Sequence, residues 1–220
     1  MSSLTVNVKA FRINLRKELV EEAEEPIAKE APINLYINNS YVITLFASPN
    51  HLKELSIGWL LSQGIIKSIE EIREIKVRKN DVKIKCSGKV EARIKAAKIS
   101  RIINTSCGST NENFHFLLDR ISKPLIRSEY KVRAEEILRF INTLNRMSKV
   151  FKTTGGAHSA AIFENGKLVA FAEDVGRHNA VDKVIGMAAL RKTDFSKSVL
   201  VSSGRQPANM VLKAARVGFQ

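Results

Sequence analysis

Alternating apolar and polar positions dominate the first hundred residues and predict β-structure. Residues 33–47 fit a hairpin that turns at Asn38 and Asn39. Residues 72–77 and 82–86 fit a second pair of strands, and residues 91–103 fit either a helix or a strand. Four apolar residues of the first hairpin are available to a core, namely Leu35, Ile37, Val42 and Leu45.

Helical spacing of apolar residues appears in two places. A helix is predicted after Ser48, Pro49 and Asn50, and Gly64 ends it as a left-handed cap. Its apolar positions are Leu52, Leu55, Trp59 and Leu60. A second helix is predicted over 134–147. Its apolar stripe consists of Ile137, Leu138, Ile141, Leu144 and Met147.

Strands and helices alternate in the last third of the chain. Strands are predicted over 158–163 and 168–173 around an Asn-Gly turn, and a buried strand over 198–201. Helices are predicted over 181–190 and after Pro207. This order predicts a three-layer α/β domain over 104–220, preceded by a smaller β-rich region with one helix over 1–103.

The composition describes a basic chain of 220 residues with a formal net charge of +14. The basic residues are spread along the sequence, which is explained equally well by general solubility and by an anionic ligand. No nucleic-acid motif is present, so that class of partner ranks last. No apolar run reaches the roughly 20 residues of a membrane helix, and no signal segment opens the chain. We therefore expect a soluble cytoplasmic protein that binds no membrane.

The two cysteines lie in different surroundings. Cys86 ends a strand-like run and is most simply a core residue. Cys107 lies in a turn-rich segment, which makes it the better candidate for chemistry. Two cysteines are too few for a disulfide scaffold, and without a Cys-x-x-Cys pair we expect no metal site.

Three segments are too rich in glycine and polar side chains to be ordinary connections. The first is 153–158, where Gly155 and Gly156 allow close approach of a ligand and His158 follows. A tight turn into the next strand is the simpler explanation of this segment taken alone. Another of the three segments contains Ser203, Gly204 and Arg205. It lacks the Gly-Lys-Ser/Thr ending of a nucleotide P-loop but can hold a phosphate through backbone N–H groups.

The second of these segments, 173–179, lies between a strand and a helix, where α/β folds bind ligands. Asn179 is predicted to cap the helix, whose amino terminus favours an anion. Arg177 offers a bidentate fork for a phosphate or a carboxylate. The other candidate ligand-binding residues here are Asp174, Gly176 and His178.

For several of these residues a purely structural role is the alternative to ligand binding. His158 and His178 are alternatively core histidines at strand ends. Asp174 and Asp182 alternatively orient Arg177 and Lys183 and never contact a ligand.

Together these segments resemble the FdhD family. The stretches 151–161, 173–183, 201–205 and 210–215 match its motifs in order, and residues 25–66 resemble its opening region. The resemblance implies an α/β/α sandwich like that of cytidine deaminase in the second domain. The zinc signature of that enzyme class is absent, which disfavours metal-dependent deamination.

The resemblance also implies a sulfurtransferase. Such a protein accepts sulfur from a cysteine desulfurase as a persulfide and passes it to a molybdenum cofactor with two guanine dinucleotides, molybdenum bis(molybdopterin guanine dinucleotide), before formate dehydrogenase receives it. Cys107 matches the first cysteine of the family's Cys-Gly-x-Cys loop and is thereby the expected persulfide carrier. The three glycine-rich segments then line the cofactor pocket. A homodimer stays open.

The sequence departs from the family pattern in two respects. Thr110 stands where many members have a second cysteine, which keeps a non-catalytic, cofactor-binding chaperone as the alternative. The family's carboxy-terminal segment, which contributes to cofactor binding, does not follow Gln220, so the completeness of the pocket stays open.

Overall fold

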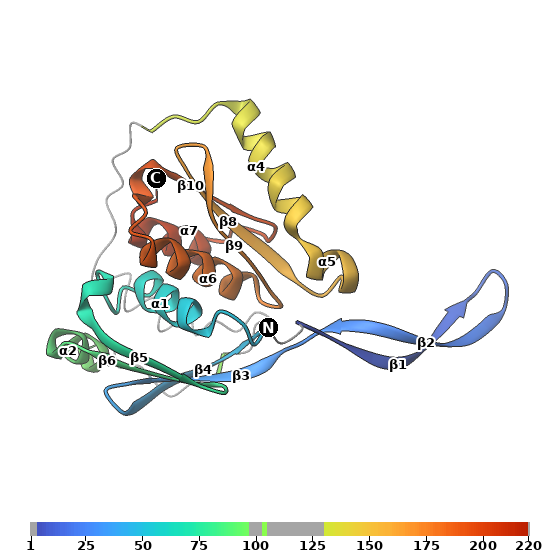
Figure 1. The fold of residues 1–220 in the computed structure, drawn as a ribbon, viewed down its shortest axis with the longest axis horizontal. Helices are drawn as coiled ribbons and strands as arrows, with labels where there is room; N and C mark the ends of the chain where they lie inside the picture. The colour runs from blue at the N-terminus through green and yellow to red at the C-terminus, as the bar shows by residue number, and fades with distance from the viewer. Residues whose placement is uncertain (1–3, 97–102, 105–129, 220) are drawn as a thin grey trace.

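The computed structural model describes residues 4–96, 103–104 and 130–219 (Figure 1). The elements before residue 105 are, in chain order, β1 (Thr5–Asn14), β2 (Leu19–Ala28), β3 (Ala31–Ile37), β4 (Ser40–Ala47), α1 (Leu52–Ser62), the 3₁₀ turn η1 (Ile69–Glu71), β5 (Ile72–Arg78), β6 (Asp81–Cys86), α2 (Gly88–Ala96) and β7 (Ile103–Asn104). The later elements are α4 (Ala134–Met147), α5 (Lys149–Thr154), β8 (His158–Glu164), β9 (Lys167–Asp174), α6 (Arg177–Leu190), the 3₁₀ turn η2 (Phe195–Lys197), β10 (Ser198–Ser202) and α7 (Ala208–Val217).

A five-stranded sheet in the order β5-β6-β3-β4-β7 forms the first layer. Both predicted strand pairs are present as antiparallel pairs, β3 with β4 and β5 with β6. The four apolar residues assigned to the first hairpin are all buried. They alternate with half-buried or exposed residues along β3 and β4, as expected for a sheet that packs on one face.

A second sheet, in the order β10-β8-β9, lies between α4 on one face and α6 on the other (Figure 1). The face toward α4 buries Phe140 and Leu144 of the helix against Ala161 and Phe163 of β8. The opposite face packs on α6. The predicted mixed α/β fold and its three layers are thus confirmed, whereas the likeness to cytidine deaminase stays a prediction.

The two sheets are joined through α1 and α6, which cross with their backbones in contact. A Cβ added to Gly58 of α1 would lie 1.7 Å from the carbonyl oxygen of Asp182, and one added to Gly186 of α6 would lie 1.9 Å from that of Glu54. Helix α1 is covered on all sides and nine of its eleven residues are buried, which explains its poorly amphipathic sequence. One hydrophobic core therefore includes both sheets. The division into domains at residue 103 stays a prediction.

Three predicted details differ in the structure. Helix α6 begins at Arg177 and not at Val181, because residues 177–180, three of which are polar, form its first turn. The ambiguous segment from 91 is helical as far as Ala96. Strand β10 is mostly half-buried, since it lies at the edge of its sheet.

The predicted apolar stripe of α4 is only partly buried. Leu144 packs on the sheet as expected, but Ile137, Leu138 and Ile141 are exposed. Phe140, which is not in the stripe, occupies the core instead. The stripe spans more of the helix surface than the narrow three-stranded sheet covers.

Strands β1 and β2 form a separate antiparallel pair that extends away from the body of the molecule (Figure 1). We refer to residues 5–28 as the arm. The arm contacts the body through β2 and α5. Among the described residues, no helix is long and apolar enough to cross a membrane.

Candidate functional site

The three glycine-rich segments meet at one end of the β10-β8-β9 sheet. Strand β8 runs antiparallel to both neighbours, so its start lies beside the ends of β9 and β10. His158 is opposite Asp174, and Ala160 is opposite Ser202. The sheet topology thereby brings together segments that lie up to 50 positions apart in the sequence, as the ligand-site hypothesis requires.

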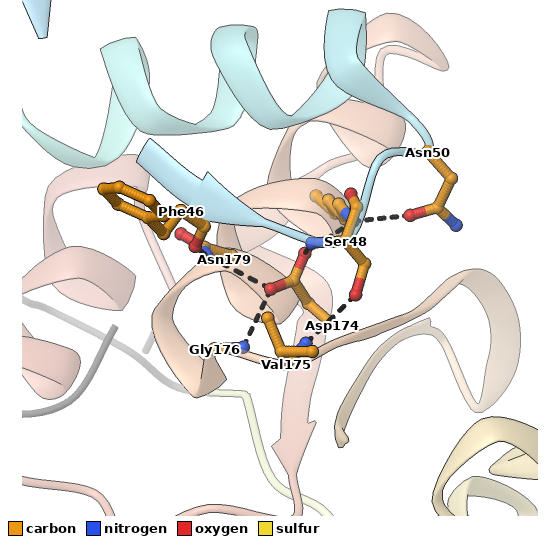
Figure 2. A network of polar contacts seen from close by, with 8 residues as sticks. Phe46, Ser48, Asn50, Asp174, Val175, Gly176 and Asn179 are labelled. Atoms are coloured by element: carbon orange, nitrogen blue, oxygen red, sulfur yellow. Dashed lines mark hydrogen bonds and ion pairs between the residues drawn. The ribbon is translucent and has the colours of Figure 1, made fainter. Parts of the chain in front are cut away.

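The carboxylate of Asp174 organises this end of the sheet (Figure 2). It is fully buried. One oxygen accepts hydrogen bonds from the backbone N–H of Gly176 at 2.8 Å and from the side-chain amide of Asn179 at 3.1 Å. The other accepts one from the N–H of Ser48 at 3.0 Å and lies 2.6 Å from Nζ of Lys183. Because all these partners belong to the protein, Asp174 acts here as a positioning group.

The same network joins the β9–α6 loop to the loop that precedes α1. The side-chain amide of Asn179 donates to the carbonyl of Phe46 at 2.7 Å. Lys183 donates to the carbonyl of Ser48 at 3.0 Å and to Oδ1 of Asn50 at 2.6 Å (Figure 2). The hydroxyl of Ser48 accepts from the N–H of Val175 at 3.2 Å. The backbone of the β9–α6 loop is therefore held from both sides.

One prediction in this loop is wrong, and one alternative holds only in part, since Asp174 orients Lys183. Asn179 does not cap α6, because Gly176 is the capping residue and Asn179 lies inside the first turn. Asp174 pairs with Lys183 and not with Arg177, and Asp182 pairs with Lys213 of α7 at 2.5 Å. Adjacent positions on a helix point in different directions, so Asp182 and Lys183 face different neighbours.

Asp182 and Lys213 form a second buried ion pair. The hydroxyl of Ser62 donates to Asp182 at 2.7 Å, so the cluster joins α1, α6 and α7. Burial raises the pKa of Asp182 and lowers that of Lys183, and the paired charge opposes the shift in each case.

Arg177 and Gly204 are in close contact across two of the segments. A Cβ on Gly204 would lie 2.9 Å from Cβ of Arg177, so only glycine allows this approach. The Ser203 hydroxyl accepts from the N–H of Ser159, and the N–H of Ser203 donates to the Ser159 carbonyl, both at 2.9 Å. The Nε of Arg177 is buried and has no hydrogen-bond partner among the described residues. It is therefore a buried donor whose hydrogen bond is not made within the part of the chain that the structure describes.

The remaining predicted ligand residues differ in how far their side chains are exposed to solvent. His158 is half-buried, and burial together with the charge of Arg177 lowers its pKa, which favours the neutral imidazole. His178 is also half-buried, and Ser203 and Arg205 are exposed. The charge of Arg177 thus acts on His158 at this end of the sheet.

Gly155 and Gly156 are exposed at the end of α5. Gly155 has φ = 66°, a left-handed conformation that ends the helix. The start of the same helix is fixed by Glu173, whose carboxylate accepts from the N–H groups of Val150 at 3.0 Å and Phe151 at 2.9 Å. Glu173 thus positions the glycine turn from the neighbouring strand.

Ser48 belongs to the hydrogen-bond network of Asp174, and the sequence does not indicate this role. The segment Ser48-Pro49-Asn50 suggests only the start of a helix, and nothing in it indicates a contact with residues 126 or more positions away. Glu173, the first residue of the predicted polar segment 173–179, is a further participant.

The predictions for the two cysteines differ in how far the structure tests them. Cys107 lies outside the described residues, so its role as persulfide carrier stays a prediction. Cys86 is buried at the end of β6, and burial with the nearby charge of Glu71 raises the pKa of its thiol to about 11. Such a thiol is a poor nucleophile at neutral pH. Among the described residues, no group of three or more His, Cys, Asp or Glu side chains is placed to hold a metal ion.

Comparison with known proteins gives one consistent result. The model of the FdhD/NarQ family matches residues 28–220. Relatives named sulfur carrier protein FdhD include one from Shouchella clausii, 32% identical over 200 residues, covering 90% of this chain and 75% of the relative. Another, from Bacillus licheniformis, is 31% identical over 220 residues, covering 98% and 81%. A crystal structure of a formate dehydrogenase accessory protein from Desulfotalea psychrophila superimposes with a TM-score of 0.77 at 28% identity, covering 99% of this chain and 81% of that one.

Proposed function

The chain belongs to the FdhD/NarQ family, and from this premise we propose that it is a sulfur carrier that serves formate dehydrogenase. The names of its relatives support the role. The observation that carries the proposal is the meeting of three glycine-rich segments at one end of a sheet, around the buried Nε of Arg177, which has no partner among the described residues.

The proposed sulfur step takes place at Cys107. Its thiolate attacks the outer sulfur of a persulfide on a cysteine desulfurase, a new S–S bond forms, and the desulfurase thiolate leaves. The product is a persulfide on Cys107. Transfer of its outer sulfur as sulfide consumes two electrons, which a thiol reductant supplies.

The proposed acceptor is molybdenum bis(molybdopterin guanine dinucleotide), bound as a substrate. Arg177 and Arg205 would pair with its phosphates, and the exposed turn at Gly155 and Gly156 would let the ligand approach the backbone closely. His158 and His178 would donate from the sides of the site. Asp174 and Asn179 would hold the loop in place and make no ligand contact, as their internal hydrogen bonds indicate.

The first test is persulfide mapping. The purified chain is incubated with a cysteine desulfurase and labelled cysteine, and the persulfide is located by mass spectrometry. We expect label on Cys107, none in Cys107→Ala, and full labelling of Cys107 in the control Cys86→Ala. Absence of persulfide from folded protein would refute sulfur transfer.

A parallel titration with GDP separates binding from sulfur transfer. Binding that is lost in Arg177→Ala, in a protein without persulfide, would favour the alternative function of a non-catalytic chaperone that binds and presents the cofactor. Thr110 in place of a second cysteine is the feature that favours this alternative.

A further inference from the structure

A cavity of about 540 Å³ lies where the carboxy-terminal ends of α1, α6 and α7 meet η1. Its lining comes from four stretches of the chain, which are residues 61–64, 66–70, 189–195 and 216–217. The volume is in the range of pockets that enclose a small organic ligand. Ala189 is roughly 18 Å along α6 from Arg177, so the cavity is separate from the glycine-rich segments.

The apolar part of the lining is firmly packed. Its six residues are Leu61, Ile66, Ile69, Ala189, Phe195 and Val217. Leu61, Ile66 and Ala189 are buried members of the main core, and the other three pack against that core. The ring of Phe195 also packs against that of Phe219, with the ring centroids 5.0 Å apart. An apolar group can therefore bind here without first ordering the wall of the cavity.

Three cations and one carboxylate make up the charged part of the lining. Lys67 and Lys192 are exposed, Arg216 is half-buried, and Glu70 is the single acidic residue among the lining residues. A hydrogen bond from Ser68 lowers the pKa of Glu70, and the positive charge of Lys192 acts in the same direction. Glu70 is therefore ionised at neutral pH. Three positive charges against one negative charge leave the cavity with a formal charge of +2.

Lys192 occupies a backbone position that normally takes glycine. Its φ is 57°, in the left-handed region. The N–H of Lys192 donates to the carbonyl of Ala189 at 2.9 Å, and the N–H of Thr193 donates to that of Ala188 at 3.1 Å. These two bonds form the motif that ends many helices, in which glycine avoids the strain of a Cβ. Strained positions of this kind gather at ligand sites, so a role for the ammonium group accounts for a lysine here.

We propose that this cavity binds a small organic anion with an apolar body, such as a medium-chain carboxylate. The apolar body contacts the wall that contains Leu61, Ile66 and Phe195, and the anionic group pairs with Lys192 and Arg216. Each part of the lining recognises one part of the ligand, so an uncharged body and a bare anion both bind less well. The site is additional to the proposed cofactor site at Arg177 and does not depend on it.

The first experiment is a titration of the full-length, ¹⁵N-labelled chain followed by NMR. The probes are octanoate, octan-1-ol, which has a similar body without the charge, and acetate, which has the charge without the body. We expect octanoate to shift the backbone signals of Gly64, Thr193 and Val217 with a Kd of about 1 mM or tighter. Octan-1-ol and acetate should each bind more weakly by roughly tenfold or more. Absence of octanoate binding, equal binding of octan-1-ol, or shifts centred on Arg177 and Gly204 would each overturn the proposal.

The variant Lys192→Gly separates ligand binding from the stability of the helix end. Glycine relieves the left-handed backbone, so the thermal unfolding midpoint should equal or exceed that of the parent. Loss of the ammonium group should at the same time weaken octanoate binding about tenfold. Lys167→Ala is the matched control, because Lys167 is exposed and lies outside the cavity, and it should bind octanoate with parental affinity. Parental affinity in Lys192→Gly, or an equal loss in Lys167→Ala, would contradict the anion site.

Discussion

Nζ of Lys183 lies 2.6 Å from Oδ2 of Asp174, and neither side chain has any exposed surface. Removal of either partner leaves an uncompensated charge inside the protein, which costs about 3–5 kcal/mol. We therefore expect Asp174→Ala and Lys183→Met each to lower the free energy of unfolding by that amount in urea titrations. The double variant should lose less than the sum of the two, because it buries no lone charge.

The matched control for this pair is Lys197→Ala, which breaks the exposed ion pair with Asp194. Its unfolding midpoint should equal that of the parent. Equal effects of the buried and exposed variants would show that Asp174 does not organise the β9–α6 loop.

The crossing of α1 and α6 depends on Gly58 and Gly186. A methyl group on either glycine meets backbone atoms of the facing helix at less than 2 Å, so the helices must separate. We expect Gly58→Ala and Gly186→Ala each to destabilise the protein by about 3 kcal/mol, at the upper end of overpacking effects. Gly88→Ala is the control, since nothing lies within 4 Å of its added Cβ. Thermal unfolding of the three variants checks the difference, and an unaffected Gly58→Ala would exclude the close crossing.

Acid sensitivity is expected from Glu71. Arg93 donates two hydrogen bonds to its carboxylate, at 2.9 and 2.6 Å, and lowers its pKa from an ordinary value of 4.5 to about 2. A carboxyl with a depressed folded-state pKa contributes stability above its unfolded pKa and loses it as the pH falls through the folded pKa. The contribution should therefore disappear between about pH 4.5 and pH 2.

Glu71→Gln tests this assignment. The pair is partly open to solvent, so we expect a loss of roughly 1 kcal/mol at pH 7 and a smaller further loss on acidification than in the parent. Urea titrations at several pH values measure both quantities. The exposed residue Glu135 provides the control variant Glu135→Gln, and the idea fails if Glu71→Gln keeps the full acid dependence of the parent.

Local features of the fold were predictable because their causes are local. Asn165 and Gly166 both have positive φ, at 47° and 77°, in the hairpin that their dipeptide predicts. Gly64, with φ = 68°, follows α1 where a left-handed cap was expected. The meeting of the second and third glycine-rich segments was predictable because each follows a strand of the same predicted sheet, and the family resemblance adds the first segment.

The partners of these features were not predictable from the sequence. Periodicity identifies the apolar stripe of α4 but not the width of the surface that covers it, so Ile137 and Ile141 remain exposed. The link between Ser48 and Asp174 crosses 126 positions, and neither residue type is unusual where it stands. Contacts of this kind follow from the docking of α1 on α6.

Cys86 should be inert in the native protein. A rise of its thiol pKa to about 11 from an ordinary 9.0 lowers the thiolate fraction at pH 8 by roughly a hundredfold. In a Cys107→Ser background, we expect alkylation by iodoacetamide to be slower by at least that factor in native than in urea-unfolded protein. Mass spectrometry of timed samples measures the rate. Rapid native alkylation would mean that Cys86 is available as a second sulfur-handling thiol.

The contact between Gly204 and Arg177 should govern anion binding. A methyl group at Gly204 would lie 2.9 Å from Cβ and 3.1 Å from Cδ of Arg177, and so would displace the guanidinium. We expect Gly204→Ala to weaken GDP binding about tenfold, or about 1.4 kcal/mol, in isothermal titration calorimetry. Arg177→Ala should weaken binding at least as much, and the double variant should lose no more than Arg177→Ala alone, because both changes act through one side chain. Gly88→Ala serves as the control with parental affinity. Full additivity of the two changes would show that Gly204 contacts the nucleotide by itself, and unchanged affinity in all variants would place the anion site elsewhere.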